Sequence, residues 1–315
     1  MATTQTFGGG VHPREIGNGK NATQSLQIVN AAAPARVMIA MAQHAGAPAV
    51  CCVKVGQTVN MGQIIGEAQG FISAPVHASV SGKVVAITTC TVASGKSVPA
   101  VVIDNDFEDR WDESVKPCDN VDALSAADIV SIAARCGIVG MGGAAFPTNV
   151  KLDTSKLEEK PDTLIVNGSE CEPYLTSDHR IMVENAEQIV DGIALAMKAS
   201  GVACAKVGIE DNKPDAIAAM REAASGKQNI EVVSLPARYP QGFEKTLIYS
   251  LTGRIVPNGK LPSAAKCVVM NVGTCAALSA AVRKGQPLID RVVTVTGRVA
   301  NPANFRVRIG TPLLD

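Results

Sequence analysis

Short apolar runs alternate with segments of helical periodicity from residue 163 onward, and this alternation restricts the fold more than any other feature. The apolar runs are Thr163-Leu-Ile-Val166, Lys206-Val-Gly-Ile209, Ile230-Glu-Val-Val-Ser-Leu235 and Cys267-Val-Val-Met270. The segments with helical character are 181–200, 214–222, 246–251 and 275–284. Parallel strands need a crossover connection, which is usually a helix. We therefore predict an α/β layer with parallel strands.

The first apolar run ends in a polar turn, Asn167-Gly-Ser-Glu170-Cys-Glu172-Pro-Tyr174. An open α/β sheet places its ligand chemistry outside the carboxyl ends of its strands. This turn is therefore a candidate binding site. The alternative is a solvated loop in which Glu170 and Glu172 form salt bridges.

A glycine-rich loop precedes this turn in the chain, with Gly140, Gly142 and Gly143 followed by Lys151. Glycines let a backbone approach a phosphate closely, and successive free N–H groups cradle an anion. The alternative is a set of tight turns that connects a helix to a strand. The spacing up to Ala145 also matches the dinucleotide pattern G-x-G-x-x-A, but that pattern follows a strand, whereas this loop follows a predicted helix. We interpret the loop as part of a nucleotide or flavin site.

That preceding helix has its own start signal. Ser125 is a favourable N-cap residue, and Asp128 lies three residues on, as in a capping box. Its pattern stops at Gly137, where the glycine-rich loop begins.

Residues 34–118 are predicted to form a small β domain, preceded by an extended arm over residues 1–33. Short alternating runs separated by glycine turns have the pattern of a biotinyl/lipoyl-type barrel-sandwich. Such modules carry a swinging arm on a lysine at a hairpin tip. Here the tip reads Glu67-Ala-Gln-Gly70-Phe71, so Gly70 stands in the lysine's place and no carrier function is expected.

Composition excludes several classes of protein. Lys plus Arg and Asp plus Glu both number 29, and aromatic residues make up 3%, so neither a basic nucleic-acid surface nor a base-stacking platform is expected. The start of the chain has no signal-peptide pattern, and no apolar run approaches the ~20 residues that cross a bilayer. A reducing cytosol with free thiols is expected for the nine cysteines, which show no C-x-x-C spacing. The four histidines form no metal set, so no metal ligand is predicted.

Several motifs together resemble the RnfC subunit of the Rnf electron-transport complex over nearly the whole chain. They are Gly9-Gly-Val-His-Pro13, Gly46-Ala-Pro48, Phe71-Ile-Ser-Ala-Pro-Val-His77, Gly140-Met-Gly-Gly-Ala-Ala-Phe-Pro-Thr148, Asn167-Gly-Ser-Glu-Cys-Glu-Pro-Tyr174, Tyr239-Pro-Gln-Gly242 and Arg291-Val-Val-Thr-Val-Thr-Gly297. The middle of the chain is also similar to the flavin- and NADH-binding subunit of respiratory complex I. The resemblance implies an oxidoreductase and translocase subunit, an NADH:ferredoxin oxidoreductase of an ion-translocating complex. Its noncovalent FMN would exchange a hydride with NADH or NAD and pass electrons singly to iron–sulfur clusters.

The resemblance also implies cofactor-binding residues but no catalytic residue. They are Gly140, Gly142, Gly143, Lys151, Asn167, Glu170, Glu172, Gly242, Glu244, Lys245, Asn271 and Thr274. Asn271 and Thr274 would hold the FMN phosphate where a strand turns into a helix, since a helix N-terminus is an anion site. Lys151 or Lys245 near the flavin ring would favour the anionic reduced flavin. The complex I relative has arginine at Met141, glycine at Ala145, aspartate at Ser169 and glutamate at Lys245.

The resemblance implies a domain plan: an arm (1–33), a barrel-sandwich domain without its carrier lysine (34–118), a Rossmann-like FMN/NADH-binding domain (119–286) and the start of an SLBB-type β-grasp unit (287–315). The chain is expected to be truncated, with two [4Fe–4S] clusters in the missing C-terminal region.

The expected partners are the other subunits of the membrane complex, NADH and, indirectly, ferredoxin. The expected location is peripheral, on the cytoplasmic side of the cell membrane. Two alternatives are an electron-transfer subunit of a soluble amino-acid reductase and a non-catalytic adaptor for an electron-transfer partner.

Overall fold

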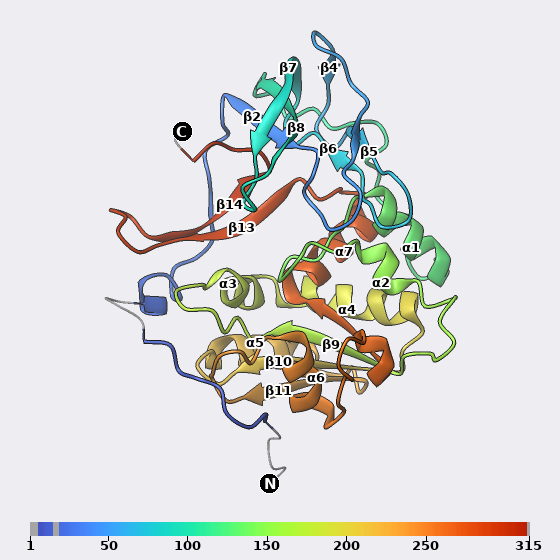
Figure 1. The fold of residues 1–315 in the computed structure, drawn as a ribbon, viewed down its shortest axis with the longest axis vertical. Helices are drawn as coiled ribbons and strands as arrows, with labels where there is room; N and C mark the ends of the chain where they lie inside the picture. The colour runs from blue at the N-terminus through green and yellow to red at the C-terminus, as the bar shows by residue number, and fades with distance from the viewer. Residues whose placement is uncertain (1–5, 15–18, 314–315) are drawn as a thin grey trace. The chain divides into compact units, whose positions relative to one another are not determined.

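The computed structural model describes residues 6–14 and 19–313, which form two compact units (Figure 1). Unit 1 comprises Met1–Val29, Leu152–Ser279 and Val292–Phe305, and unit 2 comprises Asn30–Lys151, Ala280–Arg291 and Arg306–Asp315. Residues 1–5, 15–18 and 314–315 lie outside this description. The predictions that fall partly on them are the N-terminal arm, the start of the chain without a signal-peptide pattern and the C-terminal truncation. The bounds of the four domains predicted from the sequence remain predictions.

Unit 2 contains two antiparallel sheets, which confirm the barrel-sandwich prediction. The first has the order β2-β8-β7-β4, with β2 at Arg36–Ala40, β8 at Ser97–Asn105, β7 at Gly82–Thr91 and β4 at Thr58–Val59. The second has the order β3-β5-β6, with β3 at Val50–Cys51, β5 at Ile64–Glu67 and β6 at Val76–His77. Buried valine, isoleucine and alanine side chains of both sheets form one core. Gly70 lies exposed between β5 and β6 with φ at +80°, so a glycine-favouring turn stands where a carrier lysine would project.

Two helices flank the glycine-rich loop. α1 spans Ala126–Arg135, and its predicted capping box is confirmed: the Ser125 hydroxyl accepts from the Asp128 N–H while the Asp128 carboxylate accepts from the Ser125 N–H. α2 spans only Thr148–Leu152 and begins directly after Pro147. The loop therefore follows a helix and precedes a five-residue helix, so it is not a dinucleotide fingerprint.

Unit 1 is built on a four-stranded parallel sheet of order β11-β10-β9-β12, which confirms the predicted Rossmann-like α/β layer. The strands are β9 (Thr163–Gly168), β10 (Cys204–Glu210), β11 (Ile230–Leu235) and β12 (Cys267–Asn271). All of β12, at one edge of the sheet, and five of the six residues of the central strand β9 are buried, as strands of a parallel sheet covered on both faces are.

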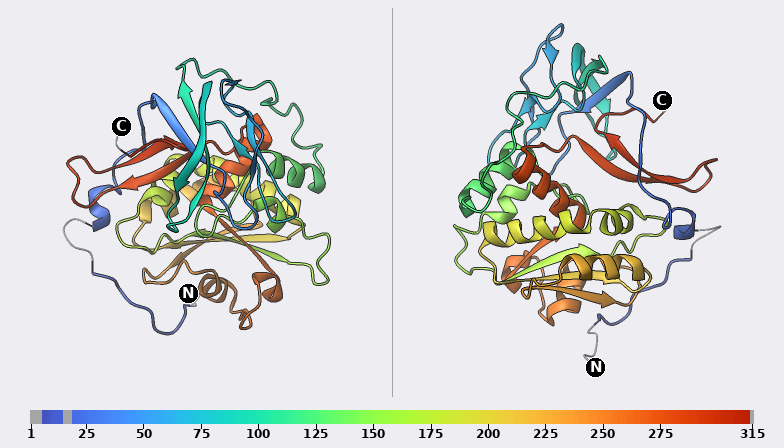
Figure 2. Two further views of the ribbon diagram at one scale, coloured as in Figure 1. Left: turned by 45° about the horizontal axis from the view of Figure 1, so that its top comes forward. Right: turned by 180° about the vertical axis from the view of Figure 1, so that it is seen from behind.

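Helices cover both faces of this sheet. They are α3 (Ser177–Glu184), α4 (Ala186–Ser200), α5 (Pro214–Ala223), α6 (Glu244–Thr252) and α7 (Val272–Lys284). Figures 1 and 2 show α4 on one face of the sheet and α6 on the other. Leu247, Ile248 and Leu251 of α6 pack on Ile165. On the other side, a Cβ at Gly192 of α4 would lie 1.8 Å from the Cys275 carbonyl oxygen, so glycine is required for α4 to approach α7 this closely.

The predicted helix over 181–200 is two helices, because Asn185 adopts φ −132° and interrupts the helical backbone between α3 and α4. The break matters for the site, because it makes α3 a separate helix whose N-terminus follows the 167–174 turn.

The last strands are β13 (Asp290–Val295) and β14 (Ala303–Arg308), which lie in the segment 287–315 predicted to begin an SLBB-type unit. With β1 (Val29–Asn30) they form a three-stranded sheet of order β1-β14-β13. Two short 3₁₀ helices, η1 (Gly19–Ala22) and η2 (Pro262–Ala265), complete the elements. All nine cysteines are free thiols. Within residues 6–14 and 19–313, every helix is too short or too polar to cross a membrane.

Candidate functional site

The strand order of unit 1 contains a topological switch point. From β9 the chain proceeds outward to β10 and β11 and then returns to the other side of β9 to form β12. Ligands of open α/β sheets bind outside the carboxyl ends of the two strands that flank such a point. Here those ends carry Asn167 on β9 and Asn271 on β12, both of which are predicted site residues.

Asn167 connects the turn after β9 to the loop that precedes α6. Its Nδ2 donates to the Gly242 carbonyl oxygen at 2.9 Å, and its Oδ1 accepts from the Ser169 N–H at 3.1 Å. The Gly242 N–H lies 3.3 Å from Cys171 Sγ, and an added Cβ at Gly242 would lie 3.3 Å from the same sulfur. Two loops far apart in the sequence are thus packed against each other, with little room for a side chain at residue 242.

Glu170 is buried, with 6% of its surface exposed, and has a left-handed backbone at φ +48°. Its carboxylate accepts from the backbone N–H groups of Asp178 at 2.7 Å and His179 at 3.2 Å, in the first turn of α3. A negative charge there is stabilised by the positive end of the helix dipole. Burial nevertheless raises the pKa of the Glu170 carboxyl to about 7; the Asp178 carboxylate adds to this rise, and Lys20 and Lys213 oppose it. Glu172, two residues on, is exposed.

Asn271 connects β12 to α3. Its Oδ1 accepts from the Gly273 N–H at 2.8 Å and the Thr274 N–H at 3.4 Å, which caps the start of α7. Its Nδ2 donates to Asp178 Oδ2 at 2.6 Å. Thr274 is buried in the first turn of α7, with 1% of its surface exposed.

The remaining predicted residues of unit 1 begin α6. Glu244 is its first residue and is half-buried. Lys245 Nζ donates to the Pro257 carbonyl oxygen at 3.4 Å, so its ammonium lies against the loop that follows α6. Eight predicted residues therefore come from three strand-to-helix connections of one sheet, including the strand ends and the first helical turns.

The other four predicted residues, Gly140, Gly142, Gly143 and Lys151, belong to unit 2. The stem of the glycine loop is a small hairpin: the Gly140 N–H donates to the Phe146 carbonyl at 2.9 Å, and the Thr148 N–H donates to the Ile138 carbonyl at 2.9 Å. Gly142 and Gly143 are exposed at its tip, and a Cβ added to Gly143 would meet no atom within 4 Å. Packing within the protein therefore does not require glycine at residue 143, and the role of this loop in ligand binding stays a prediction.

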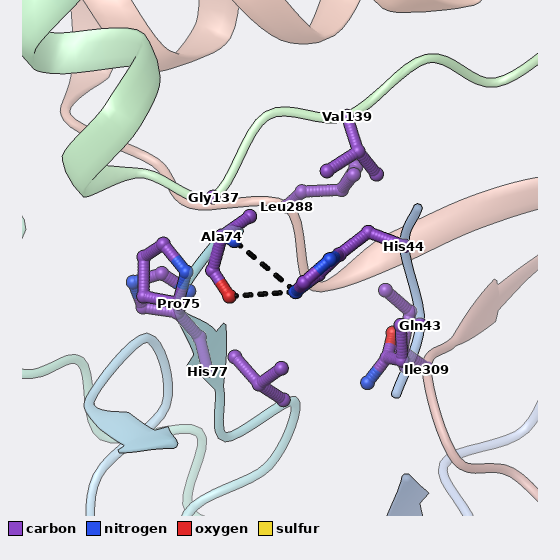
Figure 3. A pocket seen from close by; sticks show the side chains of 10 residues that line it. Gln43, His44, Ala74, Pro75, His77, Gly137, Val139, Leu288 and Ile309 are labelled. Carbon is purple, nitrogen blue, oxygen red and sulfur yellow. Dashed lines mark hydrogen bonds between the residues drawn. The ribbon is translucent and has the colours of Figure 1, made fainter. Parts of the chain in front are cut away.

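A small hollow lies at the stem of this loop (Figure 3). It is lined by Gln43, His44, Ala74, Pro75, Val76, His77, Gly137, Val139, Leu288 and Ile309, all in unit 2. The Ala74 N–H donates to His44 Nε2 at 3.1 Å. Burial lowers the pKa of His77 to about 4, so its ring is neutral at pH 7. The twelve predicted cofactor-binding residues are not among this lining, and we interpret the hollow as packing under the loop.

The structure adds polar residues that the sequence did not single out. Lys213 is 1% exposed, and its ammonium donates to the Ser169 carbonyl at 2.7 Å, Asn212 Oδ1 at 2.9 Å and Glu210 Oε2 at 3.2 Å. It thereby connects the end of β10 to the turn after β9. The sequence carries a weak signal for this residue, because Lys213 lies in a polar turn between the apolar run 206–209 and the helical segment that begins at residue 214.

One buried polar atom near Asn167 bears on whether this region can bind a polar ligand such as FMN. The Ser169 hydroxyl is fully buried and has no hydrogen-bond partner within the described part of the chain. A buried polar group without a partner is costly and calls for an explanation such as a ligand. The Ser169 hydroxyl gives the turn after β9 an unsatisfied donor and acceptor for a polar group of a ligand, and in this respect the residues fit a phosphorylated flavin.

Comparison with known proteins defines the class of each part. Residues 5–108 match the RnfC barrel sandwich hybrid domain, residues 133–280 the Nuo51 FMN-binding domain, and residues 292–315 the SLBB domain. The chain is similar in fold to a chain of an NAD⁺-reducing [NiFe]-hydrogenase in its H₂-reduced state, with a TM-score of 0.51, 23% identity, and coverage of 58% of this chain and 37% of that one. The chain thus combines a barrel-sandwich domain with an FMN-binding α/β domain.

Similar proteins extend over nearly its full length. The C subunit of the Na⁺-translocating ferredoxin:NAD⁺ oxidoreductase complex of Acetobacterium woodii is 46% identical over 308 residues, 98% of this chain and 69% of that protein. The corresponding subunit of the proton-translocating complex of Clostridium ljungdahlii is 46% identical over 99% of this chain and 67% of that protein. A Pseudomonas aeruginosa relative, the same subunit of an ion-translocating oxidoreductase complex, is 42% identical, but this chain spans only 40% of its length. The chain belongs to the RnfC family of ion-translocating oxidoreductase complex subunits.

Proposed function

We propose that this chain is the FMN-containing subunit of an ion-translocating ferredoxin:NAD⁺ oxidoreductase complex, in which it exchanges electrons with NADH. The observation that carries the proposal is the switch point between β9 and β12, where Asn167, the buried Ser169 hydroxyl and the Asn271-capped start of α7 lie at one edge of the sheet. Membership of the RnfC family supports electron exchange with NADH as the reaction at this site.

Bound FMN would supply two-electron chemistry with NADH and one-electron chemistry with the next carrier. In unit 1, the positive end of the α7 dipole, with Thr274 in the first turn, would favour the FMN phosphate, while the Gly273 and Thr274 N–H groups donate to Asn271 Oδ1. Asn167 and Gly242 connect the turn after β9 to the loop before α6, and the exposed Glu172 would contact the nicotinamide nucleotide. In unit 2, Gly140, Gly142, Gly143 and Lys151 would contribute a close backbone approach and a positive charge.

The onward path and the location are parts of the same proposal. Electrons would pass to iron–sulfur clusters outside residues 1–315 and then to other subunits of the complex, with ferredoxin as an indirect partner. The chain would bind peripherally at the cytoplasmic side of the membrane.

The test begins with flavin binding. Purified protein is incubated with FMN, passed through a desalting column and examined for oxidised-flavin absorbance. We expect a yellow protein whose absorbance is bleached by NADH under anaerobic conditions. A protein that remains colourless would contradict the proposal and support the adaptor alternative.

Glu172→Gln is expected to raise the KM for NADH by about three- to tenfold while FMN content stays unchanged. Glu172 is exposed, so the amide removes a charge from the ligand side of the turn without a packing defect. The measurement is steady-state NADH oxidation with an artificial acceptor, and Glu159→Gln, at an exposed acid of the same unit, is the control. An unchanged KM in Glu172→Gln would exclude a role for this carboxylate in NADH binding.

A further inference from the structure

The N-terminal arm contributes directly to the α/β unit. Residues 1–29 belong to unit 1, although the barrel-sandwich family match begins at residue 5. The Val11 N–H donates to the Tyr239 carbonyl at 2.8 Å, and the Tyr239 N–H donates to the Val11 carbonyl at 2.7 Å. The Arg238 guanidinium lies 5.6 Å from the Phe7 ring centroid. The arm thus holds the loop that leads to Gly242 and α6.

Lys20, in η1, reaches the other loop of the candidate site. Its ammonium donates to the Glu170 carbonyl oxygen at 2.8 Å and to the Leu175 carbonyl oxygen at 2.6 Å. These two carbonyls bracket a turn in which both Glu170 (φ +48°) and Tyr174 (φ +68°) have left-handed backbones. Such conformations cost free energy in non-glycine residues and persist only where the surroundings hold them. Lys20 supplies part of that restraint through two charge-assisted hydrogen bonds.

The position of η1 does not depend on Lys20 alone. The Thr23 and Thr176 hydroxyls are hydrogen-bonded at 2.6 Å, and Asn304 Nδ2 donates to the Thr23 carbonyl at 3.3 Å. Thr23, Thr176 and Asn304 are each fully buried. A Lys20 variant should therefore leave the arm attached and remove only the ammonium.

Charges from three elements act on the buried Glu170 carboxyl. Asp178, on α3, opposes its ionisation, whereas Lys20 on the arm and Lys213 before α5 favour it. The ionised form also accepts from the Asp178 and His179 N–H groups. Removing the Lys20 charge would shift this balance toward the protonated carboxyl, which is a weaker acceptor.

We propose that Lys20 is a positioning residue of the candidate FMN/NADH site: it holds the turn that carries Glu170 and Glu172 through hydrogen bonds to the Glu170 and Leu175 carbonyl oxygens. The effect of Lys20 on NADH binding rests on the proposed function, whereas its effect on the conformation of the turn does not.

The first experiment uses cofactor-free protein. In Lys20→Met, the Asp178 and His179 amides should exchange hydrogen about tenfold faster or more at pH 7 than in the wild type. Lys20→Arg should restore most of the protection, because arginine keeps the charge and the donors. Lys227→Met, at an exposed lysine of unit 1, should leave both amides unchanged.

A pH series separates a charge effect from a general loosening. Burial holds the pKa of folded Glu170 above its ordinary value, so its ionisation costs stability as pH rises from the ordinary value of 4.5 toward 7. In Lys20→Met, this loss of thermal stability should continue to a pH about one unit higher. In a Glu170→Gln background, Lys20→Met should produce no such shift.

A third measurement concerns the loaded protein, in which Lys20→Met should raise the KM for NADH more than it lowers kcat. If wild-type protein binds no FMN, the proposed function fails while the exchange and pH measurements still decide the role of Lys20. If exchange and pH dependence in Lys20→Met match the wild type, the proposal for Lys20 is wrong even where FMN binds.

Discussion

Replacing Lys213 with methionine is expected to lower the free energy of unfolding by about 3–5 kcal/mol. The Lys213 ammonium lies 3.2 Å from Glu210 Oε2, and the two side chains are only 1% and 2% exposed. Methionine would leave the Glu210 carboxylate buried without its counter-charge and the Ser169 carbonyl without its donor. Removing one member of a buried pair costs far more than the net contribution of the pair, because the remaining charge stays desolvated.

The neighbouring pair Lys206–Glu231 provides a matched control. It has the same N–O distance, 3.2 Å, but its side chains are 32% and 62% exposed. Lys206→Met is therefore expected to cost less than about 1 kcal/mol. Urea unfolding followed by circular dichroism measures both variants, and equal costs would show that burial does not decide the strength of these pairs.

The cost of Lys213→Met should also depend on pH. Burial raises the pKa of Glu210 in spite of Lys213, and loss of the lysine would raise it further. Below the pKa of the unfolded carboxyl, Glu210 is protonated in both states and the penalty is small. The penalty then grows as pH rises toward neutrality, because the unfolded state ionises first. A Glu210→Gln, Lys213→Met double variant should be more stable at pH 7 than the sum of the two single changes, which a double-mutant cycle would reveal.

The order of elements was predictable because it is encoded locally. Apolar runs of strand length alternate with segments of helical period, and Ser125 with Asp128 marks a helix start by neighbouring residues alone. The break at Asn185 was missed because the apolar periodicity continues across it and only the backbone conformation changes.

The strand-end residues of the candidate site were predictable for a related reason. Asn167 and Asn271 follow apolar runs, and parallel strands place their carboxyl ends at one edge of a sheet. The sequence could not show that the Glu170 side chain turns inward to cap α3, since that depends on its φ of +48°. Lys20 lies 150 residues from Glu170 in the sequence and carries no local signal of their contact.

The glycine loop gives the second large effect: Gly143→Val is expected to weaken FMN binding by about 10- to 100-fold. Overfilling a closely packed contact typically costs about 1–3 kcal/mol, and each 1.4 kcal/mol is a tenfold change in affinity. The protein itself should tolerate the valine, because a Cβ at residue 143 meets no atom within 4 Å and its φ lies outside the left-handed region. The stability change should stay within about 0.5 kcal/mol.

Gly137, at the stem of the same loop, provides the opposite case. Its φ is +62°, and a Cβ there would lie 2.5 Å from the Pro75 carbonyl oxygen, so Gly137→Ala should destabilise the protein. Titration of FMN fluorescence together with thermal unfolding distinguishes the two glycines. Gly143→Val should lose FMN affinity and keep its melting temperature, whereas Gly137→Ala should melt earlier. Wild-type FMN affinity in Gly143→Val would mean that the loop tip does not touch the flavin, and the predicted site would then consist of the strand-end residues of unit 1.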